Sequence, residues 1–153
     1  MKIVKIMRGL PGSGKSYWSS LFSLEKSTPA SICSADKFQM DDGKYNFKPE
    51  RAGLAHFKCF TQFVNDLEVG YNRIVVDNTN TDPVEIAPYY KMAEFHYYDV
   101  EIIWMNTPLE ICLARQTHGV PITTMCNMFW NLKKELPRFW KVREIPFEKS
   151  NQG

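Results

Sequence analysis

Short apolar runs and longer amphipathic segments alternate along the chain. The apolar runs predict buried strands over residues 2–7, 30–33, 73–77 and 98–105, with a last short strand near 142–145. Apolar residues at helical spacing predict helices over residues 16–24, 50–67, 83–95, 109–115 and 122–136. Strands that alternate with helices are typical of α/β domains, so we expect a parallel sheet of four to five strands with helices on both faces.

The helix over residues 50–67 carries a wide apolar stripe, which should face the core. The stripe consists of Leu54, Phe57, Cys59, Phe60, Phe63, Val64 and Leu67. His56 lies beside this stripe and is interpreted as a structural histidine. The segment Asp41-Asp42-Gly43, just before the helix, predicts a tight turn in a polar loop.

The stretch from Gly9 to Ser16 reads Gly, four residues, Gly-Lys-Ser, between a predicted strand and a predicted helix. Glycines let successive backbone N–H groups point inward around an anion, and the following helix adds its positive N-terminal dipole. The lysine supplies a charge for the β- and γ-phosphates, and the serine hydroxyl supplies a ligand for Mg²⁺. The pattern therefore predicts a P-loop NTPase fold of three α/β/α layers that binds ATP or another nucleoside triphosphate. The residues expected to hold it are Gly12, Ser13, Gly14, Lys15, Ser16 and Tyr17.

Other polar residues follow the predicted strands, at the sheet edge where ligands of parallel sheets bind. Asp36 can act as a general base on an acceptor hydroxyl, or can simply cap a turn. Asp77 can help to hold Mg²⁺ or can cap its own loop. The following Asn78, Thr79 and Asn80 can contact an acceptor or shape the loop.

Residues 109–122 should form a helical lid over this edge. Arg115 ends the short lid helix and can stack on the adenine or neutralise transition-state charge. His118 is a weaker candidate, since a loop histidine is more often exposed without a role. Beyond the lid, residues 123–153 form a basic helix and tail, and from Arg115 onward there are seven Lys/Arg against three Asp/Glu. Such a region suits an anionic substrate, although it can also be an ordinary solvated face.

Composition adds little to this picture. The 153 residues include 44% apolar residues, a value typical of one globular domain. The formal charge of +2 is too small to indicate nucleic-acid binding by itself. The four cysteines are widely spaced, which predicts reduced core residues rather than disulfides or a zinc site. We expect a soluble intracellular protein with no membrane partner.

Four motifs together resemble one branch of the small P-loop kinases, the polynucleotide 5′-hydroxyl kinases, a group that includes the zeta-toxin-type kinases. The motifs are residues 8–16, Ser34-Ala35-Asp36, Asp77-Asn78-Thr79-Asn80 and residues 115–121. The resemblance spans about residues 2–136. It implies that Lys15 and Ser16 bind Mg²⁺ and the triphosphate, that Asp36 is the general base, and that Arg115 lies over the donor. It also implies that the loop from Asp77 to Asn80 lines the acceptor side.

Two positions depart from the phage enzyme of that branch. An arginine that contacts the acceptor phosphate is replaced here by Gln39, and a second lid arginine by His118. Both changes weaken the expected grip on an acceptor phosphate. We interpret the chain as an ATP- and Mg²⁺-dependent kinase that phosphorylates 5′-hydroxyl ends of DNA or RNA. The alternatives are a small-molecule kinase acting on a sugar, nucleoside or antibiotic, and a non-catalytic regulatory nucleotide-binding module.

Overall fold

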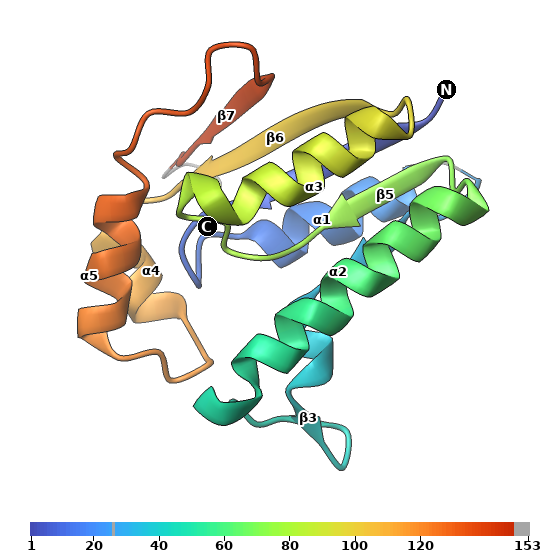
Figure 1. Ribbon diagram of the computed structural model, residues 1–153. Helices are drawn as coiled ribbons and strands as arrows, with labels where there is room; N and C mark the ends of the chain where they lie inside the picture. Colours follow the sequence, from blue (N-terminus) through green and yellow to red (C-terminus); the bar gives the residue numbers. More distant parts are fainter. Residues whose placement is uncertain (26, 149–153) are drawn as a thin grey trace.

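The computed structural model describes residues 1–25 and 27–148, which fold around a five-stranded parallel sheet (Figure 1). The strand order is β2-β5-β1-β6-β7, with every neighbouring pair parallel. The strands are β1 (Ile3–Arg8), β2 (Ser31–Cys33), β5 (Arg73–Val76), β6 (Asp99–Asn106) and β7 (Val142–Pro146). The prediction of a parallel sheet of four to five strands is confirmed, and each strand lies within one or two residues of its predicted range.

Helices cover both faces of the sheet. The helices are α1 (Lys15–Leu24), α2 (Ala52–Val69), α3 (Pro83–Phe95), α4 (Leu109–Arg115) and α5 (Ile122–Asn131). Alternate residues of β1 point to opposite faces, as strand geometry requires. Val4 and Ile6 pack with α2 and α3, whereas Met7 packs with Phe22 of α1. The fold is therefore a three-layer α/β/α sandwich.

The helix α2 forms as predicted, but part of its apolar stripe faces away from the core. Cys59, Phe63 and Leu67 are buried, whereas Leu54 and Phe57 are exposed in the first turns. Those turns extend past the edge of the sheet, beside a small hairpin (Figure 1). The inward orientation predicted for Leu54 and Phe57 is therefore wrong, because this part of α2 extends beyond the sheet and has no core to face.

The predicted turn at Asp41-Asp42-Gly43 is present and closes an antiparallel hairpin of β3 (Met40–Asp41) and β4 (Lys44–Tyr45). Strands of two residues leave no apolar alternation, so the sequence did not predict them. A 3₁₀ helix, η1 (Ala35–Phe38), precedes the hairpin, and a second, η2 (Pro49–Arg51), follows it. The hairpin thus stands between the segment of Asp36 and the start of α2.

The lid region consists of α4 and α5, which pack on each other around Leu10, Cys112 and Met125. The helix α5 ends at Asn131, whereas the prediction extended it to residue 136. The predicted basic tail runs to residue 153, of which residues 149–153 lie outside the described part. Within the described residues, helices long and apolar enough to span a bilayer are absent.

Candidate active site

The phosphate loop connects β1 to α1, with Gly14 as the N-terminal cap of α1. Gly12 has a φ of 85°, in the left-handed region, and a Cβ added there would lie 2.7 Å from the carbonyl oxygen of Cys112 in α4. A larger residue would meet both backbone strain and a collision. The loop therefore curls at the helix N-terminus, the arrangement that binds phosphate.

Lys15 points back along this loop. Its Nζ donates a hydrogen bond to the carbonyl oxygen of Leu10 at 2.9 Å, and the side chain is buried. Burial lowers the pKa of Lys15, and the nearby carboxylate of Asp77 partly opposes this. The hydroxyl of Ser13 is also buried and has no hydrogen-bond partner within the described residues. The buried cation of Lys15 at the loop fits an incoming anion.

The carboxylate after β5 meets the first turn of α1. Ser16 Oγ donates a hydrogen bond to Asp77 Oδ2 at 3.0 Å. Burial raises the pKa of Asp77, whereas Lys15 and the Ser16 hydrogen bond lower it. A hydroxyl and a carboxylate beside a phosphate site are the hard oxygen ligands that Mg²⁺ prefers. The described residues hold no cluster of three His, Cys, Asp or Glu, so this pair would need phosphate and water ligands to complete the ion's shell.

Asp36 lies on the other side of the same pocket, exposed, in η1. Its Oδ2 is 3.9 Å from Nδ1 of His118, which comes from the loop between α4 and α5. The His118 ring stacks on Tyr45 of the hairpin, with ring centroids 4.0 Å apart. Burial and the charge of Asp36 raise the pKa of Tyr45. A lid residue, a hairpin residue and the predicted base therefore meet at one point.

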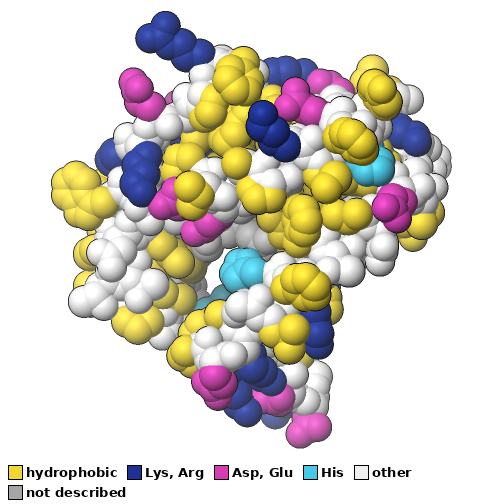
Figure 2. All heavy atoms as spheres, in the orientation of Figure 1, with side chains coloured by type: hydrophobic (Ala, Val, Ile, Leu, Met, Phe, Trp, Pro, Cys, Tyr) yellow, Lys and Arg dark blue, Asp and Glu magenta, His cyan; other side chains and the backbone are white. Residues whose placement is uncertain are grey.

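These groups line one cavity of about 730 Å³. On the visible face it opens as a hollow between the lid and the start of α2 (Figures 1 and 2). One part is formed by the phosphate loop and the lid, and includes Lys15, Tyr17 and Arg115. The rest is formed by η1, the hairpin, the start of α2 and α5. Of the predicted site residues, the cavity lining contains Gly12, Gly14, Lys15, Ser16, Tyr17, Asp36, Asp77, Asn78, Thr79, Arg115 and His118.

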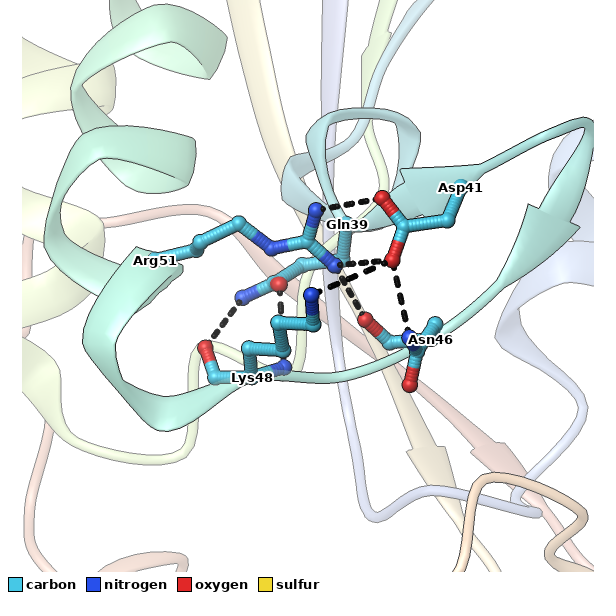
Figure 3. Close-up of polar contacts among 5 residues, drawn as sticks. All are labelled: Gln39, Asp41, Asn46, Lys48 and Arg51. Carbon is cyan, nitrogen blue, oxygen red and sulfur yellow. Dashed lines mark hydrogen bonds and ion pairs between the residues drawn. The ribbon is translucent and has the colours of Figure 1, made fainter.

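Ser13, Gln39 and Asn80, also predicted at the site, are not among the described lining residues. The buried Asn80 donates from Nδ2 to the carbonyl oxygen of Met7 at 2.8 Å, which ties its loop to the end of β1. Gln39 is buried and makes hydrogen bonds through both ends of its amide with the backbone of Lys48 (Figure 3). Neither amide faces a substrate, so Gln39 and Asn80 do not enter the acceptor contacts proposed below.

Asn78 lines the cavity and also makes a hydrogen bond that joins two loops. Its Oδ1 accepts a hydrogen bond from the backbone N–H of Ala35 at 2.9 Å, joining the loops after β2 and β5. Arg115 is exposed at the end of α4, with its guanidinium carbon 5.5 Å from the ring centre of Phe147. Its charged head therefore lies beside the ring of Phe147 at the edge of the cavity.

Three features of the site were not anticipated. Arg8 is buried, and its guanidinium donates to the carbonyl oxygens of Asn80 and Thr81 at 3.1 and 2.8 Å. His56, interpreted as a structural histidine, is exposed and lines the cavity, so that interpretation is wrong. Phe47 also lines the cavity, and only its place just after the predicted turn could have hinted at this.

A phosphate loop after the first strand of a parallel sheet, with a Lys-Ser pair and an acidic residue on the neighbouring strand, defines a P-loop nucleotide-binding domain of the kinase type. The chain belongs to the AAA_33 family, described as an AAA domain, which matches residues 4–118. The predicted P-loop kinase family is thereby confirmed.

Several known proteins are similar to the chain. Human NEDD4-binding protein 2 is 32% identical over 124 residues, which are 77% of this chain and 7% of that protein. A chain of the Pnkp1/Rnl/Hen1 RNA repair complex superposes with a TM-score of 0.66 at 18% identity, covering 86% of this chain and 44% of that one. A sugar kinase from Janibacter sp. gives a TM-score of 0.61 at 13% identity, covering 95% and 86%. At these identities the solved structures support the fold.

Proposed function

We propose that this protein is an ATP- and Mg²⁺-dependent kinase that transfers the γ-phosphate to the 5′-hydroxyl end of DNA or RNA. The observation that carries the proposal is the position of Asp36. It lines the same cavity as Lys15, Ser16 and Asp77, yet it is exposed and makes no hydrogen bond to any of these three described residues. An exposed carboxylate is free to receive a proton, whereas Asp77 is already engaged by Ser16.

The transfer follows from these positions. The loop N–H groups and Lys15 hold the triphosphate, with Lys15 turning from the Leu10 carbonyl toward the phosphates. Asp36 accepts the hydroxyl proton as the acceptor oxygen bonds to the γ-phosphorus, and the bond from that phosphorus to the β-γ bridging oxygen breaks, releasing ADP. Ser16 and Asp77 would hold Mg²⁺, which would neutralise charge on the phosphates.

The lid contributes from the opposite side. Arg115 supplies a second positive charge at the donor end, in the segment 109–122 that we propose closes over the nucleotide. His118 lies close enough to Asp36 to hold it in place when the lid approaches. We therefore assign Arg115 to the donor and His118 to positioning of the base.

Two observations favour a nucleic-acid acceptor over a small alcohol. The acceptor side of the cavity carries the half-exposed aromatic residue Phe47, which suits stacking with a base. One similar structure belongs to an RNA repair complex, although another is a sugar kinase. The acceptor must therefore be tested against both classes.

The test is transfer of labelled γ-phosphate to a panel of 5′-hydroxyl oligonucleotides, nucleosides and sugars. Asp36→Asn keeps the size of the side chain but removes its basicity, and should lower transfer by about a hundredfold or more with ATP binding unchanged. Asp42→Asn, in the hairpin turn and outside the cavity lining, is the matched control and should retain full transfer.

Each result separates the candidates. Transfer to sugars in preference to oligonucleotides would establish the small-molecule kinase. ATP hydrolysis with no transfer to any acceptor would establish the regulatory nucleotide-binding module. Full transfer by Asp36→Asn would show that Asp36 is a turn residue, and combined loss of ATP and Mg²⁺ binding would assign it to the metal.

A further inference from the structure

We infer that the acceptor is recognised chiefly through its terminal nucleobase, which stacks on Phe47, and that Gln39 is the residue that positions Phe47. This inference rests on the proposed function and specifies how the same cavity selects its acceptor. It makes recognition depend on a base rather than on a backbone phosphate.

Gln39 holds the backbone on both sides of Phe47, and its two side-chain bonds to Lys48 are drawn in Figure 3. Its carbonyl oxygen accepts a hydrogen bond from the N–H of Asn46 at 2.8 Å. Its side-chain Oε1 accepts from the N–H of Lys48 at 3.2 Å, and Nε2 donates to the carbonyl oxygen of Lys48 at 3.3 Å. Gln39 is only 3% exposed, so these bonds are shielded from water. Phe47 is thus fixed between two clamped neighbours.

The clamp is linked directly to the proposed base. The N–H of Gln39 donates to the carbonyl oxygen of Asp36 at 3.0 Å. The same short segment therefore sets the position of the carboxylate and of the aromatic ring. A base stacked on Phe47 would be held at a defined distance from the group that receives the hydroxyl proton.

Two positive charges that follow the hairpin, Lys48 and Arg51, are paired with Asp41 (Figure 3). Asp41 binds Arg51 through two hydrogen bonds of 2.9 and 3.3 Å and lies 3.6 Å from Lys48 Nζ. Among the described residues that line the main cavity, the lysines and arginines are Lys15 and Arg115, both at the donor end. Lys37, next to Asp36, lines an adjoining pocket, but its ammonium group is hydrogen-bonded to the carbonyl oxygen of Ile32. The part of the main cavity around Phe47 therefore offers little to grip a phosphate.

What remains is an uncharged slot with an aromatic wall. Phe47 is half exposed, and Pro49 and His56 continue its side of the cavity. Pro121, Thr124 and Met128, at the start of α5 and along it, line the cavity from the lid, across the hollow seen in Figure 2. Tyr45 is less available, since His118 already stacks on its ring. An uncharged, partly aromatic surface in the same cavity as the proposed base fits a nucleobase.

The test compares two oligonucleotide acceptors that differ only in the first nucleotide, one intact and one lacking its base. The wild-type protein should phosphorylate the intact acceptor with a kcat/KM on the order of tenfold or more above the abasic one. Phe47→Ala should abolish this preference by raising the KM for the intact acceptor, with the KM for ATP unchanged. Phe57→Ala, an exposed phenylalanine of α2 outside the cavity lining, is the control and should keep the preference.

Gln39 is tested by a variant of similar shape without hydrogen bonds. Gln39→Met should raise the KM for the intact acceptor, whereas the KM for ATP and the KM for the abasic acceptor should stay the same. A loss of general stability would instead lower all of these activities together. Phe47→Tyr keeps the aromatic face and should therefore keep the preference for the intact acceptor. Phe47→Leu is apolar but not aromatic and should lose this preference.

The outcomes are distinct for the two proposals. Equal use of intact and abasic acceptors by the wild-type protein overturns the stacking inference and leaves the kinase proposal in place. A hundredfold or greater loss of acceptor affinity between 50 and 200 mM salt would also overturn it, since roughly a threefold loss accompanies each phosphate contact on a single strand. Transfer to no 5′-hydroxyl nucleic acid refutes the proposed function itself.

Discussion

The close contact between Gly12 and α4 predicts that a larger residue at position 12 destabilises the protein, and Gly43 provides a glycine for comparison. Gly12→Ala places a methyl group 2.7 Å from the Cys112 carbonyl oxygen and 3.1 Å from the Gln116 nitrogen. Both atoms belong to the backbone, so neither can rotate away. To reach an ordinary separation of about 3.4 Å, the phosphate loop and α4 must move apart by roughly 0.7 Å.

The cost has two parts. Alanine at a positive φ costs about 1–2 kcal/mol, and forcing an extra carbon into a packed contact costs about 1–3 kcal/mol more. The sum is about 2–5 kcal/mol of unfolding free energy. For a chain of this length that corresponds to a fall in Tm of roughly 4–20 °C. The displaced loop N–H groups should also weaken ATP binding on the order of tenfold.

Gly43→Ala supplies the reference. Gly43 also has a positive φ, of 78°, but an added Cβ would meet nothing within 4 Å. It should therefore show only the backbone cost, about 1–2 kcal/mol, with normal ATP affinity. Thermal unfolding and calorimetric titration with ATP measure both quantities. Equal effects of the two substitutions on Tm and on ATP affinity would refute the idea that α4 presses on the phosphate loop.

Three further predictions concern single side chains. Lys15→Ala should abolish transfer in a folded protein, as measured by labelled-phosphate assay and circular dichroism, because it removes the charge beside Asp77. Arg115→Ala should lower kcat and Arg115→Lys should recover little, because lysine lacks the planar head; equal kcat for the lysine and wild-type proteins would show that charge alone matters. The Arg51 hydrogen bonds hold the pKa of Asp41 down to about 2. The contact between Asp41 and Arg51 is therefore fully stabilising above about pH 4 and is weakened as the pH falls toward 2; an NMR titration midpoint of Asp41 near 4 in the wild-type protein would contradict this.

The sequence located the phosphate loop well because the signal is local. The residues that curl around phosphate are consecutive, and the strand before them and the helix after them are strongly patterned. Ser16 and Asp77 are 61 positions apart, but the rule that ligands gather at the carboxyl ends of parallel strands brings them to one edge.

The acceptor half was less accessible, because spacing places a residue at an edge without giving the direction of its side chain. Gln39 follows Asp36 closely, yet its amide turns into the hairpin. Asn80 lies in the expected loop and bonds to the end of β1 instead. His56 was interpreted as structural because it lies beside apolar residues in the sequence. Helical periodicity does not show that the first turns of α2 extend beyond the sheet and line the cavity.

The buried Arg8 has a consequence for how the molecule opens. Its guanidinium donates to the carbonyl oxygens of Asn80 and Thr81 and, at 3.4 Å, to that of Asn131, the last residue of α5. Burial lowers the pKa of Arg8, and the charges of Asp82 and Glu85 oppose this. Three carbonyl oxygens from two distant segments thus accept hydrogen bonds from the guanidinium group of one arginine at the end of the central strand. In native-state hydrogen exchange, the loop after β5 and the last turn of α5 should therefore open as one cooperative unit rather than fray separately.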